Sequence, residues 1–338
     1  MCSPRLRRIN GAGEQHAEDP AAVEPSAEYV AVTRLEIGTD RVSPTVSIVI
    51  PAHNAEDTIG RAVGSAVAQV GVDREVIVVD DGSSDRTAEV LADFLSTVAV
   101  RVIFHETNRG GSAARNTGAA HAAGSWLAFL DADDEWEPER LLHAFGEVQA
   151  SGCEFAIGSF EWSRPESEGD WRCTPRLPPD VTDADLLSAP PLGAGSTLIV
   201  RASLFRDVGG FDTTMPRHQD WDLVIRLSER TRGHVVSDPL VRVHRTGRPA
   251  YRAVVLAKRQ FLRKHASAID RLTVSERRRV RAEHELDLAR YASYERMWSR
   301  MVGRLGRVLW WWPPCLIRWA AARGGGRRVR RRATRTSP

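Results

Sequence analysis

The chain has 338 residues, of which 42% are hydrophobic and 27% charged, and its formal net charge is +3. This length and apolar content suit one large or two modest domains with a sizeable core, and they exclude a chain that is disordered throughout. No apolar run is long enough to span a bilayer, no hydrophobic signal core follows the first residues, and the four cysteines lack the spacing of a zinc site, so we expect a cytoplasmic protein.

The first predicted elements follow a polar leader. Residues 1–43 are rich in Ala, Glu and Pro without sustained periodicity, and we expect them to be flexible. The apolar, β-branched run 46–51 predicts a buried strand, the segment 52–56 a loop, and the apolar spacing over 59–70 a helix. Strand, loop and helix in this order indicate the start of an alternating α/β fold.

Two further units of the same kind come next. The run 75–80 predicts a strand that ends in the acidic segment 80–85 and leads into another helix. The run 100–104 predicts a further strand, and the segment 108–111 after it contains paired glycines that let backbone approach a ligand closely. The spacing over 112–123 predicts a helix.

The next strand ends in alternating carboxylates. Residues 126–130 form a short apolar run, and Asp131 and Asp133 follow it two positions apart, so in extended backbone their side chains point the same way. Two converging carboxylates repel each other unless a cation lies between them, and oxygen ligands suit Mg2+ or Mn2+. The alternative is a solvated turn with helix-capping acids.

Strands that alternate with helices predict a parallel, doubly wound α/β sheet with right-handed crossovers. Ligands of such sheets bind beyond the carboxyl ends of the strands. Eight polar residues fall at or just after those ends, where one crevice could collect them: Asn54, Glu56, Asp80, Asp81, Arg109, Arg115, Asp131 and Asp133. Their mixture of charges fits a phosphate-bearing nucleotide with a bridging metal, and the glycine-rich loops of P-loop and dinucleotide folds are absent from the sequence.

Four motifs in chain order resemble the family 2 glycosyltransferases of the GT-A fold: Val46-Ser-Ile-Val-Ile-Pro-Ala-His-Asn-Ala-Glu56, Val78-Val-Asp-Asp-Gly-Ser-Ser-Asp85, Asn108-Arg-Gly-Gly-Ser-Ala-Ala-Arg-Asn-Thr-Gly118 and Phe129-Leu-Asp-Ala-Asp-Asp134. The resemblance continues through 209–212 and 218–226 and covers about 45–248. It implies a Rossmann-like mixed sheet flanked by helices. We expect a nucleotide-sugar-binding half at 44–134 and an acceptor-binding half at 135–250.

The resemblance implies a nucleotide-diphosphate-sugar donor, inversion at the anomeric carbon and a divalent metal, Mg2+ or Mn2+. In that scheme Asp133 is the principal metal ligand and Asp131 reaches the ribose or a metal-bound water. Arg109 or Arg115 would add charge-assisted hydrogen bonds near the diphosphate.

The resemblance also implies how the nucleoside is held. The loop Pro51–Asn54 would fix it, together with an acid at the end of the second strand. For this contact with the base edge we expect Asp81, with Asp80 as the alternative. His53 stands where relatives often carry an aromatic ring that could stack on the base.

A general base is needed to take the proton of the acceptor hydroxyl, and the resemblance implies Asp220 in the segment Gln219-Asp-Trp-Asp222. Gln219 departs from the acid that the family commonly has there and leaves the base in place. Asp222 competes for the role, but two positions along a helix it should face away from Asp220. The other interpretation of Asp220 is a helix N-terminal acid favoured by the macrodipole.

His244 follows another short strand pattern and resembles a late histidine that reaches the metal or the diphosphate in many family members. The alternative is an ordinary surface or core histidine. Residues 193–196 are small and precede the apolar run 197–200. They predict either room for the sugar or acceptor, or a plain loop entering a strand.

The last part of the chain, 251–338, is a basic extension in which helical patterns predict a pair of helices. It carries 23 Lys and Arg against 6 Asp and Glu, whereas the preceding residues carry 24 against 38. Tryptophans beside arginines in 305–338 favour membrane-surface contact, and we expect a peripheral association with the inner face of the plasma membrane. The alternatives are a partner subunit and nucleic acid, of which nucleic acid is the less favoured.

These patterns predict a metal-assisted glycosyltransferase of polysaccharide biosynthesis that acts on a cell-surface polysaccharide, a lipid-linked glycan or another glycoconjugate. A non-catalytic nucleotide-sugar-binding protein is the alternative, although the acids that such a protein would have lost are present. A nucleotidyltransferase is less favoured because the loop Pro51–Asn54 is not the Gly-rich, Lys- or Arg-bearing loop that it requires.

Overall fold

The computed structural model describes residues 28–31, 45–95, 100–163, 172–173, 181–188, 194–236, 238–244 and 249–316. The strands are β1 (Glu28–Ala31), β2 (Val46–Ala52), β3 (Arg74–Asp80), β4 (Val100–His105), β5 (Trp126–Phe129), β6 (Glu135–Trp136), β7 (Phe155–Gly158), β8 (Glu161–Ser163), β9 (Arg172–Cys173), β10 (Ile199–Arg201), β11 (His234–Val236) and β12 (Val241–His244). The helices are α1 (Ile59–Val67), α2 (Thr87–Ala92), α3 (Gly111–Ala120), α4 (Arg140–Ser151), α5 (Asp183–Leu187), α6 (Ala194–Thr197), α7 (Ala202–Asp207), α8 (Gln219–Ser228), α9 (Tyr251–Lys264), α10 (Ala266–Arg271), α11 (Val274–Tyr294) and α12 (Trp298–Trp311).

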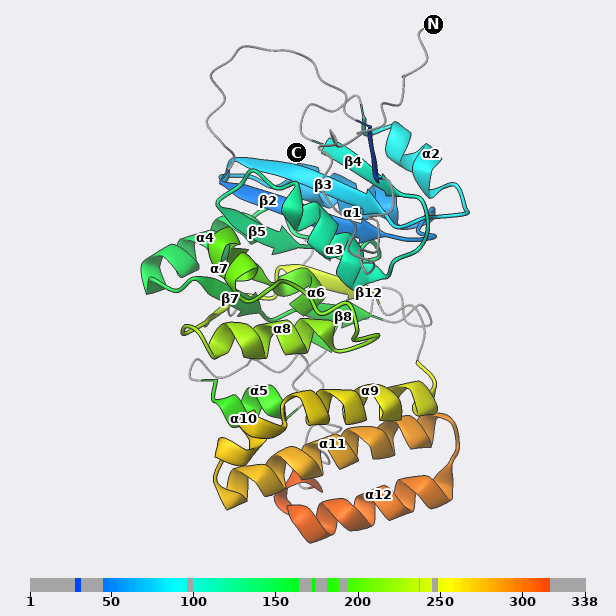
Figure 1. Cartoon of the computed structure of the whole chain (residues 1–338), viewed down its shortest axis with the longest axis vertical. Coiled ribbons are helices and arrows are strands. Elements are labelled where there is room, and N and C mark those ends of the chain that lie inside the picture. Colours follow the sequence, from blue (N-terminus) through cyan, green and yellow to red (C-terminus); the bar gives the residue numbers. More distant parts are fainter. Residues whose placement is uncertain are drawn as a thin grey trace, which may run out of the picture.

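A mixed sheet with the order β1-β4-β3-β2-β5-β10-β7-β11 forms the centre of the fold (Figure 1). Strands β2, β3, β4 and β5 are mutually parallel, and their carboxyl ends therefore lie along one edge. Pairing aligns Ala52 of β2 with Asp80 of β3, and Asp80 with Phe104 of β4. The loops that follow these strands consequently meet at a single edge, as the sequence predicted.

In the other half of the sheet one strand, β10, runs in the opposite direction to its neighbours. β10 runs antiparallel to both β5 and β7, whereas β11 is parallel to β7. A smaller sheet, β6-β12-β8-β9, lies beside the loop that follows β5. Because β6 begins at Glu135, directly after the acidic segment, its pairing with β12 brings the end of β12 towards that segment.

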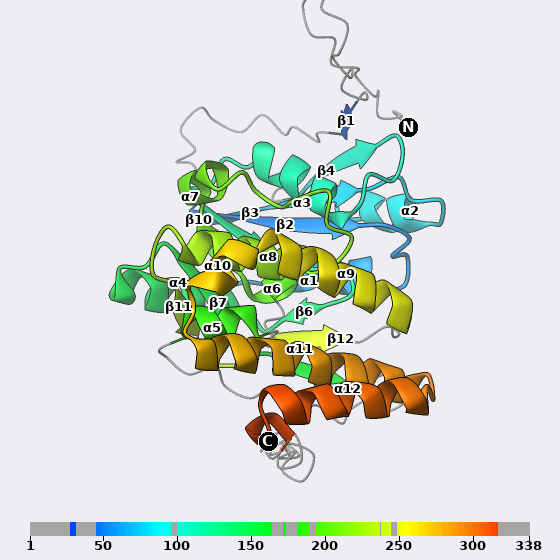
Figure 2. The same ribbon diagram turned by 60° about the horizontal axis from the view of Figure 1, so that its bottom comes forward.

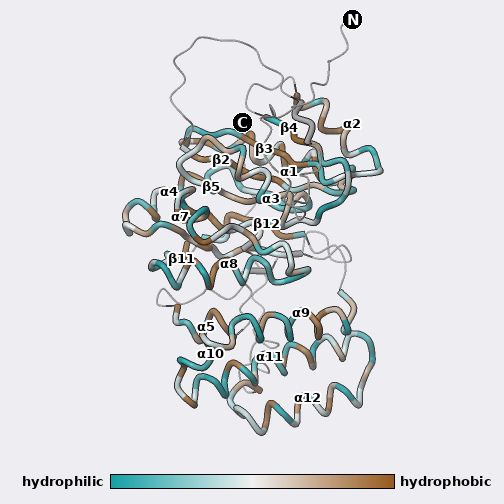
Figure 3. The backbone as a smooth tube through the Cα atoms, viewed as in Figure 1, coloured by the Kyte–Doolittle hydropathy of each residue, from teal (hydrophilic) through white to brown (hydrophobic). Residues whose placement is uncertain are grey.

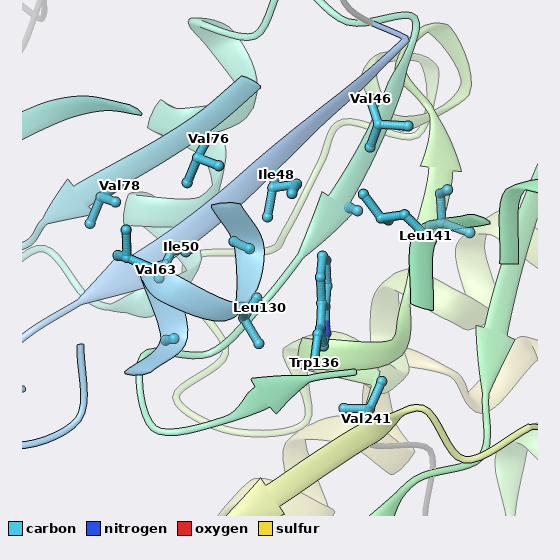
Figure 4. Packing of buried hydrophobic residues seen from close by; sticks show 14 of the residues in the cluster. Val46, Ile48, Ile50, Val63, Val76, Val78, Leu130, Trp136, Leu141 and Val241 are labelled. Carbon is cyan, nitrogen blue, oxygen red and sulfur yellow. The ribbon is translucent and has the colours of Figure 1, made fainter. Parts of the chain in front are cut away.

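The main core is built from the apolar runs that the sequence marked as strands. Figure 4 shows Ile48 and Ile50 of β2 beside Val76 and Val78 of β3, with Trp136 on the far side of the cluster. All of these side chains are almost fully buried. In Figure 3 the central strands are hydrophobic along most of their length, whereas α9, α11 and α12 alternate between hydrophilic and hydrophobic positions.

The structure differs from the sequence-based expectations at two short elements. β1, inside the stretch 1–43 that was expected to be flexible, pairs antiparallel with β4; the rest of that stretch lies outside the described residues. A four-residue edge strand depends on backbone pairing with β4, which leaves little trace in local sequence. For residues 193–196 the alternative of a plain loop entering a strand is wrong, because 194–196 belong to the helix α6 and β10 begins only at Ile199.

The described part of the basic extension, which was expected to form a pair of helices, forms the four helices α9 to α12 and packs against the sheet domain (Figures 1 and 2). Phe261 of α9 is fully buried and lies 5.7 Å, between ring centroids, from Trp221 of α8. Lys258 of α9 is also buried, and its Nζ lies 2.8 Å from Asp287 Oδ2 of α11. Helices α9 and α11 therefore share their core with α8.

Within the residues that the structure describes, no helix combines the length and the apolar character needed to cross a membrane.

If α9 is an integral layer of the fold, Phe261→Ala should destabilise the sheet domain as well as the extension. Truncating a buried Phe costs about 3–5 kcal/mol because it leaves a cavity. Urea unfolding should show one cooperative transition at a lower midpoint. Leu256→Ala, at a position 64% exposed on the same helix, is the matched control and should unfold like the native chain. Two separate transitions would contradict the shared core.

Candidate active site

A cavity of about 510 Å³ lies at the carboxyl ends of the parallel strands. Seven of the expected site residues line it: Pro51, His53, Asn54, Asp81, Arg115, Asp131 and Asp133. Five other expected residues are not part of this lining: Glu56, Asp80, Arg109, Asp220 and His244. The structure therefore brings the donor and metal candidates largely together, with the expected base and the late histidine outside the cavity wall.

The loop after β2 is fastened to the loop after β3. Asn54 adopts a positive φ of 48°, and its side-chain oxygen accepts a hydrogen bond from the Ser84 backbone N–H at 2.8 Å. Glu56 accepts one from the Arg86 backbone N–H at 3.0 Å. Both residues thus hold the rim of the cavity in shape, and of the two Asn54 is the one that lines its interior.

Asp81 organises the loop that contains the paired glycines. Its carboxylate accepts hydrogen bonds from the backbone N–H groups of Arg109 at 2.9 Å and Gly110 at 2.7 Å, and it lies 2.6 Å from His105 Nδ1. Burial alone would raise the pKa of Asp81, but the His105 contact and the two N–H groups lower it overall. Asp81 is therefore an ionised acceptor at the cavity wall, whereas Asp80 accepts from the Ser83 N–H at 3.0 Å.

His105 is a neighbour of the site that sequence reasoning missed. It is the last residue of β4 and is buried. One ring nitrogen contacts Asp81, and the other, Nε2, lies 3.0 Å from Thr117 Oγ1. A polar residue at the carboxyl end of an apolar strand was the available signal. His53 lies close by, with Nδ1 3.0 Å from the Asp81 carbonyl oxygen.

Three carboxylates gather after β5. Ligand atoms of Asp131, Asp133 and Asp134 all lie within 4.8 Å of one another. Asp134 is only 4% exposed, accepts a hydrogen bond from the Ser196 hydroxyl at 2.5 Å and another from the His244 backbone N–H at 3.1 Å. Burial, followed by the charges of Asp131 and Asp133, raises its pKa well above the usual value.

The residues present fit a divalent cation. A buried carboxyl group beside two others is unfavourable as an anion, and a cation held by the three would relieve both repulsion and desolvation. The donor set is entirely oxygen, which suits Mg2+ or Mn2+. Asp134, left without a role by its sequence position, is thus the third carboxylate of the cluster.

The acidic cluster is supported from two sides. Arg115 forms an ion pair with Asp131, and its guanidinium lies 5.4 Å from the centre of the Phe211 ring. Gly195 packs against Asp131 so closely that a Cβ atom there would lie 2.5 Å from its Oδ2. Since Ser196 also accepts a hydrogen bond from the Asp131 N–H at 3.0 Å, α6 fixes the position of the cluster.

His244, expected near the metal, lies beside the cluster but is not one of the three grouped ligands. Its Nε2 is 3.6 Å from Glu135 Oε2, and its backbone N–H holds Asp134. Burial, together with the positive charge of Arg61, lowers the pKa of His244. The imidazole is therefore neutral near pH 7 and retains ligand chemistry.

Asp220 lies in the first turn of α8, which begins directly after His218 in a left-handed conformation with φ of 63°. Burial raises its pKa, the charge of Asp131 adds to this effect, and Arg115 opposes it. The carboxyl group thus shares its electrostatic environment with the acidic cluster. A raised proton affinity is the property that a general base requires.

Asp222 has the opposite environment and is not suited to act as a base. Its Oδ2 accepts hydrogen bonds from Arg226 at 2.7 and 2.9 Å, and its Oδ1 lies 2.8 Å from Lys264 Nζ and 3.1 Å from His265 Nε2. Burial alone would raise its pKa, but these neighbours lower it far below the usual range. Asp222 therefore ties α8 to α9 through these ionic contacts.

Comparison with known proteins matches residues 47–209 to the family model described as glycosyl transferase family 2. Succinoglycan biosynthesis protein ExoO of Rhizobium meliloti (strain 1021) is 42% identical over 118 residues, which are 35% of this chain and 34% of that protein. The Escherichia coli UDP-Glc:alpha-D-GlcNAc-diphosphoundecaprenol beta-1,3-glucosyltransferase WfgD is 34% identical over 116 residues, 34% of this chain and 46% of that protein. The matches thus span less than half the length of these two relatives.

Solved structures share the fold over a larger part of the chain. S. aureus TarS 1–349 matches with a TM-score of 0.56 and 20% identity over 80% of this chain and 81% of that chain. Mannosyltransferase PcManGT from Pyrobaculum calidifontis, in complex with GDP-Man and Mn2+, matches with a TM-score of 0.55 and 18% identity over 84% and 81%. The predicted GT-A fold is confirmed by these likenesses and by the mixed sheet.

Asp222→Asn should destabilise the fold without changing side-chain size. Removing one partner from a buried ionic cluster costs about 3–5 kcal/mol, which urea unfolding at pH 7 would measure. Glu229→Gln, which weakens only the exposed pair with Arg271, is the matched control and should have little effect.

The effect of Asp222→Asn on the free energy of unfolding should depend on pH. Because the pKa of Asp222 is lower in the folded state than in the unfolded state, its contribution is present above the unfolded pKa and is lost as pH falls towards the folded pKa. The difference in stability between the native chain and Asp222→Asn should therefore shrink on acidification. A difference that is constant across the acid range would contradict an ionised Asp222.

Proposed function

We propose that the chain, whose residues 47–209 match the family model of glycosyl transferase family 2, transfers a sugar from a nucleotide-diphosphate sugar to an acceptor hydroxyl, with inversion at the anomeric carbon. The observation that carries this proposal is the cavity at the strand ends, which is lined by Asp131 and Asp133 of the acidic cluster and by the ionised Asp81. Its volume is in the range of small-molecule sites.

The nucleoside would occupy the part of the cavity near β2 and β3. Asp81 Oδ1 already has two partners, His105 and the Arg109 N–H, while Oδ2 accepts from the Gly110 N–H. A carboxylate oxygen has two lone pairs, so Oδ2 can also accept from an N–H of the base. The imidazole of His53 lines the same region and offers its flat face for stacking.

The diphosphate would lie against the acidic cluster. Asp131, Asp133 and Asp134 would hold a divalent metal, Mg2+ or Mn2+, and the bound metal would neutralise charge on the leaving nucleoside diphosphate. Arg115 keeps Asp131 oriented through their ion pair and lines the cavity itself. The neighbour PcManGT, solved with GDP-Man and Mn2+, supports this choice of ligand and metal.

Asp220 is the proposed general base. It would take the proton of the acceptor hydroxyl on the side of the sugar opposite the diphosphate. Burial raises its pKa, and this favours uptake of the proton as the new bond forms. Because Asp220 lies outside the lining of the donor cavity, it would face the acceptor.

The proposed acceptor class comes from the names of the relatives. ExoO is named for succinoglycan biosynthesis, WfgD for transfer to a diphosphoundecaprenol-linked sugar, and TuaG of Bacillus subtilis (strain 168) as a putative teichuronic acid biosynthesis glycosyltransferase. They support a role for the chain in polysaccharide or lipid-linked glycan synthesis. Of the segment 305–338 expected to touch that membrane, residues 317–338 lie outside the described part of the chain.

A donor panel would identify the substrate class. Thermal shifts would be measured with UDP-, GDP-, dTDP- and CDP-sugars, each with and without Mn2+, and any donor that binds would then be tested for turnover. The proposal expects at least one metal-dependent shift followed by transfer or donor hydrolysis. Binding without turnover with any acceptor would favour a non-catalytic nucleotide-sugar-binding protein.

Substitutions of Asp133 and Asp220 should affect donor binding and sugar transfer separately. Asp133→Asn should lose the Mn2+-dependent thermal shift with donor, because it removes a ligand charge. Asp220→Asn should keep that shift and lose transfer by at least about 100-fold, the typical contribution of a general base. Asp207→Asn, an exposed acid at the end of α7, is the matched control for a lost charge. Unchanged transfer by Asp220→Asn would refute its role.

A further inference from the structure

Helix α12 is held on the protein by one of its faces. Val308 is fully buried against α11, where it packs with Ala282 and Leu286. Arg304 forms two hydrogen bonds of 2.8 Å with the carboxylate of Glu285. In Figures 1 and 2, α12 lies on the side of α11 away from the sheet, so these contacts define its inner face.

The opposite face of α12 is hydrophobic and exposed. Trp298 is 59% exposed, Val302 62%, Leu309 55% and Trp310 82%. Three of them, Trp298, Val302 and Leu309, are spaced by four and seven residues, which places them on one stripe of a helix. Nine large hydrophobic side chains are strongly exposed among the described residues, and four of these nine lie on this one helix.

The sequence from this helix onward is basic. The 43 residues that follow Glu295 contain twelve arginines and neither aspartate nor glutamate. On the helix itself, Arg304 and Arg307 contact Glu285 of α11, and the guanidinium of Arg300 lies 5.5 Å from the centre of the Tyr251 ring. These three arginines therefore contact α9 and α11 and do not lie on the exposed stripe.

We propose that the outer face of α12, formed by Trp298, Val302, Leu309 and Trp310, docks on the surface of an anionic lipid bilayer. Indole rings favour the boundary between headgroups and acyl chains, and arginine attracts anionic headgroups. A helix with a hydrophobic face and basic flanks lies in this boundary parallel to the membrane plane. The charge favours this occupant over a protein partner, since the centres of protein interfaces are depleted of charge and no acidic residue stands among these arginines in the sequence.

The proposed membrane contact lies earlier in the chain than the contact expected from the sequence. The segment 305–338 was chosen for its Trp-Trp-Trp run, yet Trp311 packs inward, with its ring 4.9 Å from the guanidinium of Arg281. The exposed stripe instead begins about two helical turns earlier, at Trp298. Docking through α12 requires neither donor nor acceptor and is therefore independent of the proposed transfer.

Vesicle flotation of the full chain tests the proposal, using phosphatidylcholine vesicles with and without phosphatidylglycerol. The native chain should float with the anionic vesicles, and added salt should weaken its binding. The double variant Trp298→Ser/Trp310→Ser should bind at least about tenfold more weakly, because two large apolar side chains no longer enter the boundary. Both positions are exposed, so the thermal unfolding midpoint should not change.

Leu256→Ser is the matched control, since it removes a side chain that is 64% exposed on α9 and should float like the native chain. Equal flotation of the native chain and the double variant would overturn the proposal and leave the arginines alone as the cause of binding. Failure of the native chain to float would also overturn it. If the native chain then formed dimers that the double variant did not, the face would be an interface between two copies.

Discussion

Repulsion among the carboxylates that follow β5 is the constraint around which the rest of the site is arranged. Asp134 is buried between Ser196 and the backbone of His244, while Asp131 is held by Arg115 and backed by Gly195. These contacts come from segments distant in sequence. Each holds an acidic side chain close to the other two, although their charges would otherwise drive them apart. A cation bound by these acids would offset their mutual repulsion.

Helix α8 shows how environment divides labour between similar residues. Asp220 and Asp222 are two positions apart, yet burial raises the pKa of the first, while Arg226, Lys264 and His265 hold that of the second far below its usual range. Helical periodicity alone turns the two side chains in different directions. One acid thereby retains a proton affinity suited to chemistry, and the other becomes a permanent ionic link between α8 and α9.

The sequence was sufficient for the fold because local patterns and the global topology agree. The apolar runs 46–51 and 75–80, each with polar residues at its end, became parallel strands whose ends lie at the cavity. Contacts between segments that are distant in the chain could not be predicted from the sequence. Neither the burial of His105 behind Asp81 nor the place of Asp134 follows from spacing, because both depend on which loops meet in space. The site roles remain predictions, although seven of the proposed residues line one cavity.

The link between α8 and α9 bears on how such proteins can be shortened or recombined. A boundary at residue 250 looks natural in the sequence, since composition and charge change there. In the structure, a cut at that point would remove Lys264 and His265 from the buried Asp222 and would take Phe261 away from Trp221. The shortened domain would then carry a carboxylate short of partners beside a newly exposed apolar surface. A chimaera that exchanged only the C-terminal helices between relatives would therefore have to carry over a compatible α8.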